Sequence, residues 1–259
     1  MRVITLNANG IRSAVRRGFF EWVRAQEADV VCLQETRAQE HQLPPEAMGL
    51  PGFSAYFVDS KRRGYSGVAL YCRQEPVEVR RTLGWDDIDS EGRFVQADFG
   101  TVTVSSLYVP SGITGPQRQA FKMGFLERLL AVLARLRHSG RNHIVCGDFN
   151  IAHKAIDTYS AKRNGVVSGF LPEERAWMDA LLGAVGWVDA FRVVNANSKQ
   201  YTWWSNWPAA WDRNLGWRID YQVITPGLVP CVRDAAIYKE RRFSDHAPLV
   251  IDYDLASLR

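Results

Sequence analysis

The sequence has few residues that could hold a soft metal ion or build a disulfide framework. It contains four cysteines, Cys32, Cys72, Cys146 and Cys231, which lie far apart and form no CxxC pair, and only five histidines. Cys32 and Cys146 lie in apolar stretches typical of buried strands, where a free thiol behaves as a small hydrophobic group. This pattern argues against a zinc site or a disulfide scaffold, and it predicts reduced thiols in a cytosolic protein.

Long apolar runs and targeting signals are also missing. No run of apolar residues is long enough to cross a bilayer, and the chain enters a strand-like stretch at 2–6 with no basic and then apolar leader before it. We therefore expect a soluble, untargeted, cytoplasmic protein with no membrane partner. The formal net charge is only +4, which permits an anionic partner but is far from that of a histone-like binder.

The sequence does contain enough apolar material for a large core. Hydrophobic residues make up 46% of the 259 residues, and no linker, low-complexity run or repeat interrupts the chain. Period-two and apolar runs predict many strands, whereas periodicity near 3.6 predicts only a few helices. We interpret the chain as one α/β domain over residues 1–259. Strands are expected over about 3–6, 29–33, 53–58, 67–71, 76–80, 94–99, 101–109, from 144, 231–238 and 248–253, and helices from 19, over 116–138 and from 172.

The strand that starts at Ile144 ends in two polar residues, Asp148 and Asn150. Positions i and i+2 of an extended chain point to the same face, so the carboxylate and the amide would project together. Open α/β sheets place their chemistry at such strand ends. Gly-Asp and Asn are also ordinary turn residues, so this stretch alone supports a turn as well as it supports a functional site.

Polar groups at several other strand ends make a larger set that is more informative than any one member. Each residue alone has a structural explanation, such as a turn cap, an exposed acid or a packed histidine. Together they crowd carboxylates into one region, which costs charge repulsion unless a cation is bound. A hard divalent ion with oxygen ligands explains the set most simply, with Mg²⁺ favoured and Mn²⁺ as an alternative. The set is Asn7, Glu35, Tyr108, Asp148, Asn150, Asp220, Asp245 and His246.

Six segments resemble, in order, motifs of the exonuclease III family of AP endonucleases, which belongs to the wider endonuclease/exonuclease/phosphatase group. They are 7–12 (NANGIR), 33–36 (LQET), 108–112 (YVPSG), 147–150 (GDFN), 217–221 (WRIDY) and 244–246 (SDH). The resemblance runs from residue 1 to about 253. It implies a four-layer α/β sandwich, in which two packed mixed sheets lie between outer helices.

The resemblance also implies a role for each matching residue. Glu35 would hold Mg²⁺, helped by Asn7 and Asp245, and Asp148 would orient or deprotonate the attacking water. A pocket for a flipped-out abasic sugar would be walled by tryptophan, and such a pocket selects a site that lacks its base because unstacking is cheap there. Asn150 and Tyr108 would hold the scissile phosphate, and His246, paired with Asp220, would contact the same phosphate. Trp203 and Trp217 would form the wall of the pocket, and Arg218 would bind substrate.

The implied function is that of a Mg²⁺-dependent DNA repair phosphodiesterase. It combines 3′–5′ exonuclease activity on duplex DNA with AP endonuclease and 3′-phosphatase or 3′-end trimming activity. We expect a monomer that acts on double-stranded DNA with abasic sites or 3′ ends. Basic residues in loops suit contacts with the phosphate backbone: Arg12, Arg16, Arg17, Lys61, Arg62, Arg63, Lys162, Arg163, Arg218, Arg241 and Arg242.

Two alternatives remain open at this point. A phosphoesterase acting on inositol phosphates or lipid head groups would share the final Asp-His motif and the metal-binding glutamate, but it needs no tryptophan-lined sugar pocket. A non-catalytic nucleic-acid-binding regulator of the catabolite repression control type is similar over 216–218 and 221–228. Such relatives lose catalytic positions that this chain keeps, so the enzyme interpretation leads.

The segment 157–170 departs from the pattern that the resemblance implies. It has small residues over 165–169 (GVVSG) where a bulky, cationic run is expected. We hypothesise that this segment borders the sugar pocket and tunes the entry of an internal abasic site against that of a free 3′ end. Because its small residues leave room, both reactions are expected.

Overall fold

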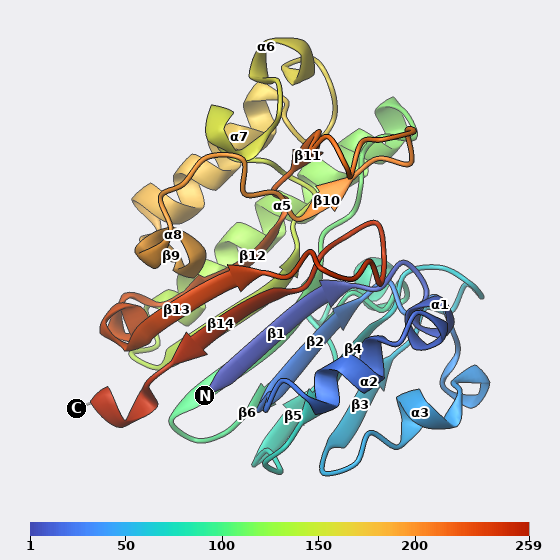
Figure 1. The fold of residues 1–259 in the computed structure, drawn as a ribbon. Coiled ribbons are helices and arrows are strands. Elements are labelled where there is room, and N and C mark those ends of the chain that lie inside the picture. Colours follow the sequence, from blue (N-terminus) through green and yellow to red (C-terminus); the bar gives the residue numbers. More distant parts are fainter. Residues whose placement is uncertain (259) are drawn as a thin grey trace.

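The computed structural model describes residues 1–258, so residue 259, the last of the expected domain, lies outside the described residues. Two mixed six-stranded sheets pack face to face, and helices cover the outer face of each (Figure 1). This confirms the four-layer α/β sandwich. Among residues 1–258, no helix is both long and apolar enough to cross a membrane.

The ten expected strands all form, and their ends lie within two residues of the expected ends. The first sheet contains β1 (Arg2–Asn7), β2 (Val30–Gln34), β3 (Ser54–Val58), β4 (Val68–Cys72), β13 (Val232–Ile237) and β14 (Leu249–Tyr253). The second contains β5 (Glu78–Arg80), β6 (Phe94–Asp98), β7 (Val102–Tyr108), β8 (Asn142–Asp148), β9 (Val188–Asp189) and β12 (Asp220–Ile224). A separate short pair consists of β10 (Trp203–Trp204) and β11 (Gly216–Trp217).

The helices divide between the two outer faces, with α1–α3 on one side and α5, α7 and α8 on the other (Figure 1). Their bounds are α1 (Ile11–Arg16), α2 (Phe19–Arg24), α3 (Pro45–Met48), α4 (Asp86–Asp89), α5 (Pro116–Arg137), α6 (Ala161–Asn164), α7 (Pro172–Asp179) and α8 (Ala190–Val194). Short 3₁₀ segments are η1 (Glu40–Gln42), η2 (Ala155–Asp157), η4 (Pro226–Cys231) and η5 (Leu255–Ser257). A short π segment is η3 (Ala180–Ala184).

Some elements were not expected. One is α4 in the acidic stretch 86–91, where the Asp89 carboxylate accepts hydrogen bonds from the backbone N–H groups of Leu83, Gly84 and Trp85 and closes the preceding turn. The strands β9 to β12 were not expected either. In β12, the central Gln222 is polar, but it is buried and donates to the backbone oxygens of Val3 and Leu249.

Each central strand buries both faces, and alternate residues face different layers. On β2, Val30 and Cys32 pack into the core between the sheets, whereas Val31 and Leu33 pack under the helices α1 and α2. The same alternation on β8 puts Ile144 and Cys146 between the sheets. Strands buried on both faces need nearly continuous apolar sequence, which explains the apolar runs.

The alternation also decides where polar strand ends meet. The sheet orders are β13-β14-β1-β2-β4-β3 and β5-β6-β7-β8-β12-β9. Asp148 at the end of β8 is directly opposite Tyr108 on β7 and Asp220 on β12. Asn7 ends β1 in the other sheet and also points inward, since it contacts Asp148. One end of the space between the sheets is therefore polar, while the N-terminus and the last described turn, η5, lie at the other end (Figure 1).

Candidate active site

Asn7 joins the two sheets at this polar end. Its Nδ2 donates to Glu35 Oε1 at 2.8 Å and to Asp148 Oδ2 at 2.9 Å, while its Oδ1 accepts the backbone N–H of Asn9 at 3.0 Å. Asn7 and Asp148 are buried, and Glu35 is 8% exposed. Asn7 thus turns its nitrogen toward the two carboxylates, so in this arrangement it orients them and does not offer its oxygen as a metal ligand.

Asp148 and Asn150 are in contact, but through a turn and not through an extended strand. Asp148 Oδ1 accepts the Asn150 backbone N–H at 2.7 Å, and Asp148 Oδ2 accepts Asn150 Nδ2 at 3.1 Å. Asn150 has a left-handed φ of 51°, so β8 ends at Asp148 and the chain turns there. Asn150 Nδ2 also donates to the backbone oxygen of Val109 at 2.9 Å, which fixes the amide beside the carboxylate.

His246 and Asp220 form a buried pair beside Asp148. His246 Nδ1 lies 2.8 Å from Asp220 Oδ2, and the residues are 4% and 0% exposed. Burial alone lowers the pKa of His246, but the contact with Asp220 and the charges of Asp148 and Asp245 outweigh it and raise this pKa to about 10. The imidazole is therefore protonated at neutral pH, and it is a cation suited to an anionic substrate.

Burial and the neighbouring carboxylates favour the neutral form of Asp148. Burial, Asp220 and Glu35 together raise the pKa of Asp148 to about 7, although His246 and the hydrogen bond from Asn150 act in the other direction. Crowded carboxylates share protons in this way because their charges repel in a medium of low dielectric constant.

Asp245 is held from several sides at the edge of the same cluster. Its Oδ1 accepts Asn9 Nδ2 at 2.8 Å and Ser244 Oγ at 3.0 Å, and its Oδ2 accepts Trp203 Nε1 at 3.2 Å. Burial alone raises the pKa of Asp245, but protonated His246 and the hydrogen bonds from Asn9 and Ser244 lower this pKa below its usual range. Asp245 is therefore ionised at neutral pH.

A cavity of about 290 Å³ opens onto these acids, and tryptophans form one wall. Trp203 and Trp217 meet edge to face, with ring centroids 6.1 Å apart and planes at 88°. Val167, Ser168 and Gly169 also line the cavity, so the segment 157–170 borders it. A Cβ at Gly169, whose φ is 100°, would lie 2.9 Å from the Trp217 ring. A side chain at Gly169 would therefore disturb this wall.

Arg218 is not where the sequence interpretation placed it. It is 1% exposed, its Nε lies 2.8 Å from Asp157 Oδ1, and its Nη1 lies 2.7 Å from Asp189 Oδ2. Its guanidinium also lies over the Tyr221 ring, 4.5 Å from the centroid. A buried guanidinium that neutralises two acids cannot reach a DNA backbone, so the expected substrate contact of Arg218 is corrected to an internal ion-pair role.

Two arginines that the sequence analysis did not single out contact the site. Arg37 forms an ion pair with Glu35, with Nε 2.7 Å from Oε2, and it lines the cavity. Its position two residues after Glu35 was an available signal. Arg93 is 1% exposed, lies 4.6 Å from the centroid of the Tyr108 ring and donates to the Tyr108 backbone oxygen at 3.0 Å. No local pattern links Arg93 to Tyr108, because the two meet only through the pairing of β6 with β7.

The residues present fit a hard divalent cation. Ligand atoms of Asp148, Asp220 and His246 lie within 4.8 Å of one another, and the two carboxylates are the members that can bind a cation, because a protonated imidazole has no free nitrogen. Among the described residues, Asp220 Oδ1 is a buried oxygen with no hydrogen-bond partner. The nearby donors Glu35 and Asp245 are also carboxylates, and hard cations prefer oxygen ligands of this kind.

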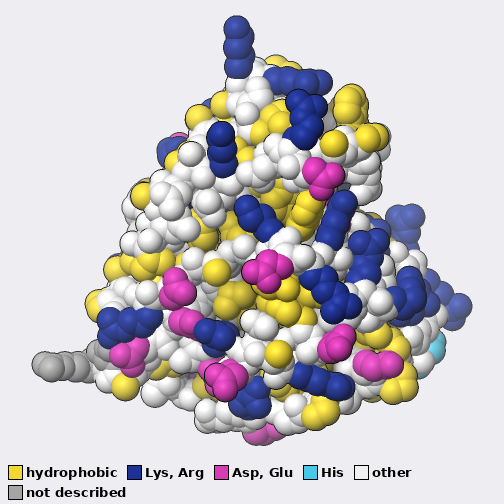
Figure 2. Space-filling view, viewed as in Figure 1, with side chains coloured by type: hydrophobic (Ala, Val, Ile, Leu, Met, Phe, Trp, Pro, Cys, Tyr) yellow, Lys and Arg dark blue, Asp and Glu magenta, His cyan; other side chains and the backbone are white. Residues whose placement is uncertain are grey.

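Basic residues lie beside the acidic cluster. Arg12, Arg16 and Arg37 line one neighbouring cavity, and Arg17 and Arg242 line another together with Asp245. Lys and Arg side chains gather along the right-hand side of the face in Figure 2, in the region of α1. These positions suit contacts with an anionic polymer that crosses the site.

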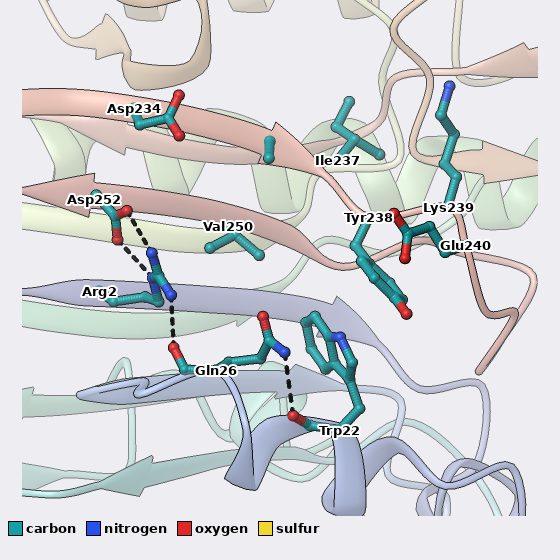
Figure 3. Close-up of a pocket in the computed structure, with 11 residues that line it drawn as sticks. Arg2, Trp22, Gln26, Asp234, Ile237, Tyr238, Lys239, Glu240, Val250 and Asp252 are labelled. Atoms are coloured by element: carbon teal, nitrogen blue, oxygen red, sulfur yellow. Dashed lines mark hydrogen bonds and ion pairs between the residues drawn. The ribbon is translucent and has the colours of Figure 1, made fainter.

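A larger cavity lies elsewhere on the molecule. It measures about 600 Å³ and lies over β13, β14 and β1 beside α2 (Figure 3). Its arginine, Arg2, is already paired with Asp252 at 2.7 Å and donates to the Gln26 backbone oxygen at 2.7 Å. Arg2 therefore neutralises Asp252, one of the acids that line this cavity.

Known proteins resemble the chain over nearly its whole length. The Endonuclease/Exonuclease/phosphatase family matches residues 4–246. The chain is 37% identical to an exodeoxyribonuclease of Bacillus subtilis, over 96% of this chain and 98% of that protein. Its fold is similar to that of an AP endonuclease from Archaeoglobus fulgidus (TM-score 0.89, 29% identity, 98% of this chain and 99% of that one). It is also similar to a 3′ phosphatase from Neisseria bound to product DNA hairpin (TM-score 0.86, 26% identity, 98% and 99%).

The raised pKa of Asp148 predicts that this site lowers the free energy of unfolding as the pH rises. A carboxyl with pKa 3.8 when unfolded and about 7 when folded favours folding fully below pH 3.8 and loses that contribution as the pH rises to 7. In a chelator, the stability of wild type relative to Asp148→Asn should therefore fall by about 2–3 kcal/mol between pH 5 and pH 8, at 1.36 kcal/mol per pKa unit. Urea unfolding at each pH measures it. Parallel pH profiles for the two proteins would contradict the shift.

Proposed function

The chain belongs to the endonuclease/exonuclease/phosphatase family, and from that premise we propose that it is a metal-dependent DNA repair phosphodiesterase of exonuclease III type. The proposed activities are 3′–5′ exonuclease on duplex DNA, AP endonuclease and 3′-phosphatase or 3′-end trimming. One catalytic domain over residues 1–259 carries them as a monomer. The observation that carries the proposal is the buried acidic cluster that opens onto a cavity walled by tryptophan.

Mg²⁺ is the proposed cofactor. Glu35 and Asp245 would hold it, with Asn7 orienting Glu35 through its amide nitrogen. When bound, the ion neutralises negative charge that builds on the phosphate and on its leaving oxygen. The free oxygen of Asp220 and the raised pKa of Asp148 support a site that is completed by a cation.

Asp148 is the proposed base. Hydrogen bonds from Asn7 and Asn150 fix its carboxylate, so it can orient a water molecule and take its proton. Protonated His246, held by Asp220, would donate a hydrogen bond to the phosphate and stabilise the extra negative charge of the transition state. Asn150 and Tyr108 would hold other phosphate oxygens.

The cavity wall supports selection of a sugar without its base. Trp203 and Trp217 present apolar ring surface next to the acids, which suits a deoxyribose better than a highly charged inositol phosphate. A binding-only regulator would have no need of the complete set of acids, and here every catalytic position of the resemblance is occupied. These features favour the nuclease over both alternatives.

The first test is metal dependence. Cleavage of a duplex with one abasic site should disappear in excess EDTA and return when Mg²⁺ is added, because the clustered acids must accept an anionic phosphate among them. A gel assay with labelled DNA measures it. If cleavage persists after exhaustive chelation, the metal-dependent mechanism is wrong.

The second test concerns the base. Asp148→Asn should reduce turnover by at least about 10²-fold, the usual contribution of a general base, while DNA binding is kept or becomes tighter because a negative charge is removed. Single-turnover cleavage and DNA titration separate the two effects. Asp86→Asn, which changes an exposed acid on α4, serves as the control and should behave as wild type. An Asp148→Asn protein with more than about a tenth of the wild-type rate would exclude the base role.

The third test concerns the pocket. Trp203→Ala or Trp217→Ala should impair abasic-site incision and removal of a recessed 3′ nucleotide together, since both substrates would use the same wall. Trp85→Ala removes a partly buried tryptophan beside α4 and α5, away from the cavity, and should leave both reactions intact. The wild type should perform both reactions. If it attacks only the recessed end, the cavity is closed to internal lesions and the open-pocket hypothesis fails.

A further inference from the structure

Lys122 and Glu174 form an ion pair that is fully removed from solvent. Both are 0% exposed, and Lys122 Nζ lies 2.5 Å from Glu174 Oε1. Lys122 comes from α5 and Glu174 from the first turn of α7, both on the outer side of the second sheet. Burying two charges is costly, and apolar residues of similar volume often serve stability equally well. Stability of the contact between the two helices therefore does not by itself explain why this pair is buried.

The remaining contacts of the pair lead to the cavity. Lys122 Nζ donates to the backbone oxygen of Asn150 at 2.8 Å. Glu174 Oε2 accepts the backbone N–H groups of Gly169 at 2.6 Å and Leu171 at 2.9 Å. Asn150 and Gly169 both line the cavity beside the acids. One ion pair thus holds two separate segments of the cavity lining from behind.

Both segments have irregular backbone. Asn150 has φ 51°, a conformation that a residue with a Cβ keeps only where surrounding contacts fix it, whereas Gly169 has φ 100°, which glycine adopts without strain. The two segments are also joined, because Ala152 N donates to the Gly169 oxygen at 2.7 Å. A shift of either segment would therefore change the distance between the phosphate-holding side and the Trp217 wall.

Neighbouring polar groups leave the Glu174 carboxylate little freedom to move. Gln119 Nε2 donates to Glu174 Oε1 at 3.1 Å, and Ser168 Oγ lies 2.8 Å from Gln119 Oε1 and 3.2 Å from Glu174 Oε1. Gly112 leaves the space for this arrangement, since a Cβ there would lie 1.8 Å from Gln119 Oε1. The network is closed and specific, as expected where geometry matters.

We propose that Lys122 and Glu174 are positioning residues that set the spacing between the phosphate side of the cavity and its tryptophan wall. The proposal rests on the nuclease function above. An internal abasic sugar is anchored by DNA on both sides, whereas a frayed 3′ nucleotide is anchored on one side and can follow a displaced wall. The pair therefore sets the preference for internal abasic sites over 3′ ends.

Kinetics on two substrates test this proposal. Glu174→Gln should lower kcat for abasic incision by about tenfold or more, as expected for small misplacements at a reacting centre. The loss for a recessed 3′ end should be smaller, and the Kd for DNA should stay within about threefold, because phosphate contacts dominate affinity. An equal loss on both substrates would overturn the proposed effect on preference.

Two control variants separate positioning from stability. Lys122→Met combined with Glu174→Met replaces the pair by apolar side chains, which should restore Tm toward that of wild type while kcat stays low. Leu133→Ala opens a cavity under the same helix α5, far along it, and should lower Tm while kcat is kept. If kcat recovers together with Tm in the double variant, the pair is only structural and the proposal is overturned.

Amide hydrogen exchange gives a readout that does not depend on activity. In Glu174→Gln, the amides of Gly169, Leu171 and Ala152 should exchange faster, while those in the centre of β8 should not. Unchanged exchange at these three amides would overturn the positioning role. A wild type that cuts neither substrate would refute the proposed function, and the exchange result would still decide whether the pair holds the cavity lining.

Discussion

Negative charge is concentrated where the two sheets meet, and much of the surrounding structure serves to hold it there. Asp148 and Asp220 face each other across paired strands, with Glu35 linked to Asp148 through Asn7. His246 supplies one positive charge, and the pKa of Asp148 rises to about 7 because burial and the nearby acids favour its neutral form. The repulsion among these carboxylates destabilises the free protein, and binding of a cation relieves this repulsion and prepares the site for a phosphate.

Two buried cations near the cavity lining complement this arrangement. Arg218 neutralises Asp157 and Asp189 behind the Trp217 wall, and Lys122 neutralises Glu174 behind the Gly169 segment. Neither cation is free to contact DNA. Both instead fix irregular backbone that follows the strand ends. This backbone lacks the hydrogen bonds between strands that would otherwise set its conformation. The regular sheets thus position the acids, and buried ion pairs position the loops that complete the cavity.

The sequence was sufficient for the fold class and for most of the acidic cluster. Strand ends are visible as apolar runs followed by polar residues, and the ordered motifs identified Glu35, Asp148 and Asp245 as neighbours. The sequence did not predict that the Arg218 side chain is buried in ion pairs. Its partners Asp157 and Asp189 are distant in sequence and meet it only in the folded chain. Lys122 offered a weak signal, since it lies on the apolar stripe of α5, where a charge requires a buried partner.

The central claim is that the acidic cluster hydrolyses a phosphodiester bond with a water molecule that Asp148 activates. The most direct measurement is mass spectrometry of the products when an abasic duplex is cut in H₂¹⁸O. The account predicts a 3′-hydroxyl on one fragment and one ¹⁸O atom in the 5′-phosphate of the other, with no such product from Asp148→Asn over the same time. An upstream fragment with an unsaturated sugar at its 3′ end, together with no ¹⁸O in the phosphate of the downstream fragment, would show elimination and would contradict the account.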